Sequence, residues 1–363
     1  EIDLPPGTDL YADAVYAKGR ENFDRFLREG TLARDATRNF YVYKQVWGDH
    51  VQVGLVAAAS CQDYLDDVIK KHELTRVDKE NDRMRHIEAL GSQTGPVFLT
   101  YRSAAAVDAL VEEATARGPE VDITTSDGVR HVFFVVDDPG LAGRIEAAFA
   151  GIDFLYVADG HHRSAAATRI KVKRDRERPG RTGREEDNFF LAVVFPHSQT
   201  KILPYNRVVR DLNGLDAAAF LEKAGARFAV LPGGPQTPAK SRSYAMFLDG
   251  LWYGLEPRPG TYDPADPIAS LDVSILQESL LGPVLGIADP RTDKRIDFVG
   301  GIRGTGELES LVRSGRFRVA FSFFPTTIEQ LFAVADAGKV MPPKSTWFEP
   351  KLKDGLVVHM IDE

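Results

Sequence analysis

The segment YVADGHHRSAAA, residues 156–167, decides the fold of the region around it. An apolar, strand-like run ends at Asp159 and Gly160, and an Ala-rich helical pattern begins at about His162. The backbone N–H groups of the first helical turn and the positive end of the helix dipole therefore meet Arg163 and two imidazoles. This DGHHR turn (residues 159–163) has four ionisable side chains in five residues, which favours a functional anion site over a simple capped helix.

Each residue of the DGHHR turn has its own chemical capacity. Gly160 permits close backbone approach, and the forked donors of Arg163 suit a phosphate. Asp159 can cap the helix, orient an imidazole or hold a divalent cation. We expect Gly160, His161, His162 and Arg163 to bind phosphate. Asp159 is the expected metal ligand, and Asp159 and His162 are candidates for the catalytic base.

A second cluster is HELT, residues 72–75. It is not the zinc motif HExxH, because Arg76 stands where the second histidine would be. One interpretation is a capping segment with Thr75 as a helix N-cap; the other makes Glu73 a catalytic base or metal ligand. We predict that His72 and Glu73 share a cleft with the DGHHR turn, and that His72, Thr75 and Arg83 contact the substrate.

Two loops near the C-terminus also carry polar or Gly-rich sequence. The first, MPPKSTWF at residues 341–348, combines two prolines, one cation and two hydroxyls. We predict that Lys344, Ser345 and Thr346 line the same cleft, although the local sequence alone favours a packed surface loop. The second, GGIRGTG at residues 300–306, lacks the GxGxxG spacing of a dinucleotide site and is expected to be a tight turn.

Strand and helix patterns alternate along the chain, with some hairpins among them. This mixture indicates an α+β (mixed α/β) fold with a mixed sheet. We expect two domains with a soft boundary, residues 1–212 with HELT and the DGHHR turn, and residues 213–363 as a C-terminal α/β region. Strands or hairpins are expected at 39–60, 96–101, 123–136 and 153–158, and helices at 63–71, 78–90, 104–117, 139–150 and from 162.

The composition excludes several classes of protein. The 363 residues include 45 Lys and Arg and 53 Asp and Glu, a formal net charge of −8, which argues against a nucleic-acid partner. The single cysteine, Cys61, excludes an internal disulfide and a Cys-rich zinc site. The apolar run at 189–196 is far shorter than the ~20 residues that span a bilayer. The basic run at 169–184 is interpreted as a solvated helix end and loop. We expect a cytoplasmic protein.

Six motifs occur in the order typical of a known family. The chain resembles the prokaryotic domain of unknown function 1015 family, often labelled ParB-like. Within it, the DGHHR turn is similar to the phosphate-binding turn of the ParB/sulfiredoxin superfamily, and most closely to that of the free serine kinases. The motifs are VYKQ at 42–45, HELT at 72–75, VADGHHRSAAA at 157–167, LPYNRVV at 203–209, FVGGIRG at 298–304 and MPPKSTWFEPKL at 341–352.

This resemblance implies a ParB/sulfiredoxin-like mixed-sheet core in which the DGHHR turn faces a nucleotide phosphate. It also places Asn206 and Arg207 among the substrate-contacting residues. The function predicted is a phosphotransferase of the kinase type that uses Mg²⁺ and a nucleotide (ATP or ADP) and acts on a small hydroxyl metabolite such as free serine. A non-catalytic nucleotide-binding regulatory or ParB-like partition module, or a phosphohydrolase, could use the same anion site.

Overall fold

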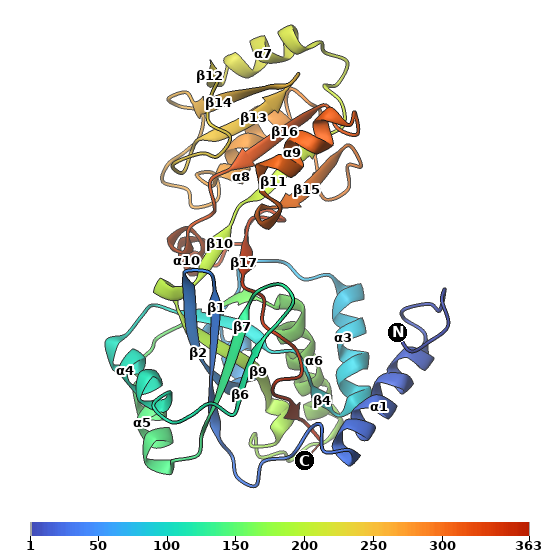
Figure 1. Ribbon diagram of the computed structural model, residues 1–363, viewed down its shortest axis with the longest axis vertical. Helices are drawn as coiled ribbons and strands as arrows, with labels where there is room; N and C mark the ends of the chain where they lie inside the picture. The colour runs from blue at the N-terminus through green and yellow to red at the C-terminus, as the bar shows by residue number, and fades with distance from the viewer. Residues whose placement is uncertain (1, 363) are drawn as a thin grey trace. The chain divides into compact units, whose positions relative to one another are not determined.

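The computed structural model describes residues 2–362, which fold as two compact units (Figure 1). Unit 1 comprises Glu1–Thr200 with Pro350–Glu363, and unit 2 comprises Lys201–Glu349. Helices and sheets occur in both units, so the expected α+β class is confirmed. The division differs from the one expected at residue 212, because the chain enters unit 2 at residue 201 and its last segment returns to unit 1.

An eight-stranded mixed sheet forms the centre of unit 1, in the order β3, β8, β5, β9, β2, β1, β7, β6. Its neighbours are antiparallel except for the parallel pairs β3 with β8 and β5 with β9. The strands are β1 (Phe40–Trp47), β2 (His50–Ser60), β3 (Ile69–Lys70), β5 (Val97–Tyr101), β6 (Val121–Thr124), β7 (Arg130–Val136), β8 (Leu155–Asp159) and β9 (Phe189–Pro196).

The β1–β2 hairpin follows from its sequence. Gly48 takes the left-handed conformation at the turn, with φ of 56°, where a glycine costs least. Side chains then alternate between two faces along each strand. One face carries apolar residues into the core of unit 1, where Val42 and Leu55 are buried with Val157.

The helices of unit 1 pack against this sheet and against one another, with α3 on α6 and α1 on α3 (Figure 1). A single helix expected over 63–71 is wrong: Asp67 has φ of 57°, and the chain turns there into β3. The helices are α1 (Asp13–Arg28), α2 (Cys61–Leu65), α3 (Val77–Leu90), α4 (Ala105–Ala114), α5 (Pro139–Phe149) and α6 (His161–Glu177), with short 3₁₀ turns at Glu186–Asn188 and His197–Gln199.

The last segment of the chain lies on unit 1. Its strand β18 (His359–Met360) pairs with β4 (Ser92–Gln93), and the amide of Gln45 on β1 donates to the Lys351 carbonyl at 2.9 Å. The basic run at 169–184 is only partly solvated: Arg174 and Arg181 both pair with buried Asp187. That part of the sequence interpretation is therefore wrong, because these guanidinium groups are held in ion pairs.

Unit 2 contains a six-stranded antiparallel sheet in the order β12, β14, β13, β16, β11, β15. Gly301 lies in the expected turn, where an added Cβ would stand 2.6 Å from the Pro204 ring. The elements are β10 (Lys201–Leu203), β11 (Tyr205–Val209), α7 (Ala217–Gly225), β12 (Phe228–Pro232), β13 (Tyr244–Leu248), β14 (Leu251–Pro257), α8 (Asp272–Leu276) with a π-helical turn at Gln277–Leu281, β15 (Ile296–Gly300), a 3₁₀ turn at Gly301–Arg303, α9 (Gly304–Arg313), β16 (Val319–Phe323), α10 (Ile328–Asp336) and β17 (Trp347–Glu349), which pairs with β10.

Within the described residues, no helix combines the length and the apolar character needed to cross a membrane.

Candidate functional site

Parallel pairing of β3 with β8 brings the HELT loop beside the DGHHR turn. Ile69 lies opposite Leu155 and Lys70 opposite Tyr156. Because the carboxyl ends of parallel strands lie at the same edge of a sheet, the segments that follow both strands are neighbours. HELT follows β3, and the DGHHR turn follows β8. The tertiary structure thus joins two motifs that are 83 residues apart in the sequence.

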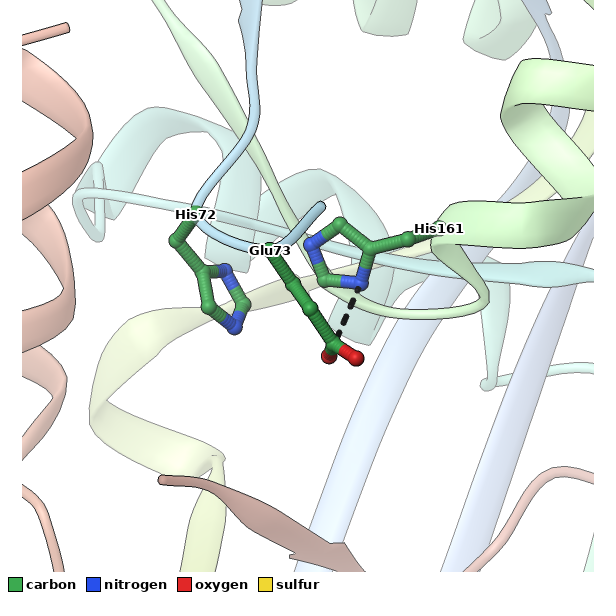
Figure 2. Close-up of side chains that lie close together, drawn as sticks. All are labelled: His72, Glu73 and His161. Atoms are coloured by element: carbon green, nitrogen blue, oxygen red, sulfur yellow. Dashed lines mark ion pairs between the residues drawn. The ribbon is translucent and has the colours of Figure 1, made fainter. Parts of the chain in front are cut away.

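His72, Glu73 and His161 form the centre of this site (Figure 2). The two imidazole rings meet edge to face with centroids 4.5 Å apart, and His161 Nδ1 lies 3.8 Å from a Glu73 carboxylate oxygen. One ligand atom from each residue can be chosen so that all three lie within 4.8 Å of one another. His72 and His161 are buried, whereas the Glu73 side chain is 44% exposed. The site therefore combines two desolvated imidazoles with an accessible carboxylate.

Burial keeps these imidazoles neutral at pH 7. Desolvation lowers the pKa of His72 to about 4, although a hydrogen bond with the Val157 backbone and the charge of Asp159 act in the opposite direction. The pKa of His161 is lowered by the same burial and further by the neighbouring His72 and His162. A neutral imidazole has one nitrogen lone pair available as an acceptor or a metal ligand.

His162 and Thr75 fasten the HELT loop to its surroundings. His162 Nε2 accepts a hydrogen bond from the Arg76 backbone N–H at 3.1 Å, so its lone pair already has a partner. Thr75 donates its hydroxyl proton to Glu80, which also receives Arg169 at 2.7 Å. Helix α3 has no side-chain cap, so the alternative in which Thr75 is its N-cap is wrong. The catalytic and ligand-binding roles assigned to His162 and Thr75 stay predictions.

Asp159 pairs with the last segment of the chain. One carboxylate oxygen accepts the Gly160 backbone N–H at 2.8 Å, and the other lies 3.1 Å from Lys351 Nζ. The Asp159 side chain is 40% exposed. Asp159 therefore stands beside the histidine cluster but outside the group of three possible ligands, and its metal-binding role stays a prediction. The family motif containing Lys351 was visible in the sequence, but its pairing with Asp159 was not.

Arg163 and Arg83 line one cavity of about 160 Å³ in unit 1. A space of this volume can admit water or a group the size of a phosphate or carboxylate. It is smaller than the pockets that enclose whole drug-sized ligands. The other lining residues are His86, Ile87, Gln93, Thr94, Gly95, Val97 and Asp354. Two guanidinium groups against one carboxylate give this cavity a preference for anions.

The backbone conformation of the DGHHR turn explains why residue 160 is a glycine. Gly160 has φ of 96°, and an added Cβ would lie 3.0 Å from the Arg163 guanidinium. No side chain caps the start of α6. Arg163 Nε is buried and has no hydrogen-bond partner among the described residues. A positively charged, incompletely satisfied group therefore lies at the positive end of a helix, as an anion site requires.

The remaining expected site residues lie in unit 2. Asn206 accepts the Phe323 backbone N–H at 3.1 Å, and Arg207 donates to the carbonyls of Tyr205 and Lys344. Ser345 donates to the Pro342 carbonyl, and both Ser345 and Asn206 are buried. These contacts are internal to unit 2. The predicted role of Asn206, Arg207, Lys344, Ser345 and Thr346 in substrate binding stays a prediction.

Sequence reasoning missed His86, Gln93, Thr94 and Asp354 as lining residues. No local pattern marks them, because each reaches the cavity from a different element or loop. Gly95 offers the one retrospective signal: its missing side chain admits the Asp354 carboxylate, whose oxygen lies 2.8 Å from the position of an added Cβ. A glycine before a buried strand can indicate such close approach.

The chain belongs to the family described as "Protein of unknown function (DUF1015)", whose model matches residues 1–274. The family resemblance seen in the six motifs is therefore confirmed. Among curated proteins, none matches the chain.

Solved structures similar to the chain share little sequence with it. A conserved hypothetical protein from Pyrococcus furiosus is 13% identical, with 83% of this chain and 94% of that chain covered and a TM-score of 0.39. A free serine kinase in complex with AMP is 12% identical, with 83% and 91% covered and a TM-score of 0.39. C-terminally truncated SbnI from Staphylococcus aureus is 12% identical, with 84% and 87% covered and a TM-score of 0.43.

Proposed function

We propose that unit 1 is a nucleotide- and Mg²⁺-dependent phosphotransferase whose acceptor is a small hydroxyl metabolite such as free serine. The observation that carries this proposal is the convergence of Arg83 and Arg163 on one small cavity at the uncapped start of α6. Phosphoryl transfer needs charge neutralisation and alignment more than covalent help from the protein. Two guanidinium groups and a helix N-terminus can supply both for one phosphate group.

Glu73 is the proposed base for the acceptor hydroxyl. Its carboxylate is 44% exposed and faces His161, so a substrate can reach it from solvent. A carboxylate can accept the hydroxyl proton as the oxygen attacks the phosphorus. Asp159, which is paired with Lys351, and His162, which accepts the Arg76 backbone N–H, are the alternatives.

Asp159 fits the metal role in this proposal because Mg²⁺ typically uses one or two carboxylates together with phosphate oxygens and water. When bound, the ion would neutralise charge on the phosphates. Lys351, which pairs with Asp159 in the structure, would have to give up this ion pair when the metal ion binds. The resemblance of the DGHHR turn to that of free serine kinases supports a kinase over the other functions that an anion site allows.

Phosphorus NMR on the full chain tests the proposal. The protein is incubated with Mg²⁺, ATP or ADP, and a pool of hydroxy-amino acids, with Glu73→Gln as the matched variant. A new phosphoester signal that wild type produces and Glu73→Gln produces much more slowly supports the proposal. Inorganic phosphate without a phosphoester would instead indicate a phosphohydrolase. Nucleotide binding without any turnover would indicate a regulatory module, and either result overturns the kinase proposal.

A further inference from the structure

The contacts of His161 distinguish it from a histidine that only fills space. Its ring is 4% exposed, and Nε2 has no hydrogen-bond partner among the described residues. Leaving a buried polar atom unsatisfied costs about 1–3 kcal/mol. His131, buried in the same unit, contacts the Tyr43 hydroxyl at 2.6 Å through one nitrogen and the Thr125 hydroxyl at 3.1 Å through the other. A buried imidazole in this unit can therefore be fully satisfied, and that of His161 is not.

We propose that His72, Glu73 and His161 bind a divalent ion of the zinc class through two imidazole nitrogens and one carboxylate oxygen. Three protein ligands of this kind leave at least one coordination position open to water or to a substrate oxygen. The site differs from the magnesium role given to Asp159, because imidazole suits zinc, cobalt, nickel and iron, whereas Mg²⁺ prefers oxygen. This inference does not rest on the phosphotransferase proposal, but it competes with the base role given there to Glu73, because a metal-bound carboxylate is not available to accept a proton; Asp159 or His162 would then be the base.

The distances allow such a site after a small adjustment. The three possible ligand atoms lie within 4.8 Å of one another. Ligands about 2.1 Å from a tetrahedral metal lie about 3.4 Å apart, so the widest separation would shrink by roughly 1.4 Å. Glu73 can make most of this movement, because its side chain is partly exposed and lies in a loop. The two histidines are already held close by their edge-to-face packing (Figure 2).

Metal titration of the full chain tests the site without any nucleotide. The protein is stripped with a chelator and titrated with Zn²⁺ and with Co²⁺, using calorimetry, elemental analysis and the visible absorption of bound cobalt. Wild type should bind about one ion per chain and retain it in excess Mg²⁺. Absence of stoichiometric binding, or its complete loss to Mg²⁺, would overturn the proposal.

Three variants make the assignment specific. Glu73→Gln keeps the side chain's size and removes its charge. Both Glu73→Gln and His161→Ala should weaken metal binding by about 10-fold or more. His50→Ala is the matched control, because His50 lies outside the cluster and contacts Gln52; its affinity should stay within about 2-fold of wild type. Thermal melting checks that each variant folds. If His161→Ala does not fold, the metal affinity of Glu73→Gln alone tests the site.

The variants show where the metal binds, and the results for wild type separate this site from the phosphotransferase. Unchanged metal affinity in folded Glu73→Gln, or an equal loss in His50→Ala, would show that the metal does not bind at the cluster. A phosphoester produced under Mg²⁺ by protein that binds no zinc would refute the metal site alone. Stoichiometric zinc binding by protein that transfers no phosphate would refute the proposed function alone.

Discussion

The two units differ in whether the nitrogens of their buried ionisable groups have hydrogen-bond partners. All eight histidines of the sequence lie in unit 1, and buried nitrogens of His161 and Arg163 have no hydrogen-bond partner among the described residues. In unit 2, Arg207 is 4% exposed, donates to two backbone carbonyls and lies over the rings of Phe298 and Phe323. A buried charge whose donors all have acceptors indicates a structural role, whereas a buried nitrogen without a partner, such as Arg163 Nε beside the cavity, is a candidate ligand contact.

The largest expected effect is on stability, from Arg207→Met in unit 2. The substitution preserves much of the side chain's apolar volume but leaves the Tyr205 and Lys344 carbonyls without their donors, which should cost about 3 kcal/mol. Urea unfolding monitored by circular dichroism gives the free energy of unfolding. A folded variant with normal stability and weakened nucleotide binding would contradict the structural role of Arg207. Arg207 would then contact the nucleotide or substrate, as the sequence predicts.

Arg163→Ala should have the next largest effect, on binding instead of stability. Removing one charge-assisted donor from the anion cavity should weaken affinity for ADP or inorganic phosphate by about 30-fold. Isothermal titration calorimetry measures this, with Arg176→Ala near the other end of α6 as a control for general charge. Equal losses in both variants would mean that the cavity contributes no specific phosphate contact.

Asp272 offers a test of unit 2 through pH. Burial raises the pKa of Asp272 from 3.8 to about 7, opposed by hydrogen bonds from the Arg242 backbone N–H. Between about pH 4 and pH 7, the folded state therefore holds a proton on Asp272 that the unfolded state has lost. The resulting contribution to the free energy of unfolding is full below pH 4 and is lost as the pH rises through 7. Asp272→Asn should remove about 1–2 kcal/mol of that pH dependence. Unfolding midpoints at pH 5 to 8 measure it, and parallel curves for the two proteins would contradict it.

The smallest expected effect, and the sharpest test of the predicted site in unit 2, is Lys344→Met. The Lys344 ammonium lies 5.5 Å from the centre of the Tyr205 ring, a contact that contributes about 0.5–1 kcal/mol at an exposed position. If Lys344 binds the nucleotide or substrate, affinity should fall several-fold, while the melting temperature falls by no more than the loss of this one contact explains. Lost stability with normal affinity would make the MPPKSTWF loop structural and remove it from the site.

Much of the site could be predicted from local sequence. HELT and the DGHHR turn were found because their ionisable residues are crowded where apolar runs end. The prediction that they share a cleft rests on the need to bring a base or metal ligand to a bound phosphate. The local sequence does not predict the short strand β3, whose pairing with β8 brings them together. A helix was expected there, since Asp63 to Lys71 has helical spacing, but the left-handed Asp67 breaks it. Propensity alone cannot resolve a two-residue strand that exists because β8 pairs with it.

By itself, the sequence determined the α+β class, the family, most of the long helices and strands, and the chemistry available at the DGHHR turn. Local periodicity and turn residues encode these features within a few neighbouring positions. Only the tertiary structure decided that Lys351 pairs with Asp159, 192 residues away in the sequence, and that Asp354 and Arg83 share a cavity with Arg163. Such contacts depend on strand order and on the path of the last segment, which arise from packing of the whole unit and leave no local pattern.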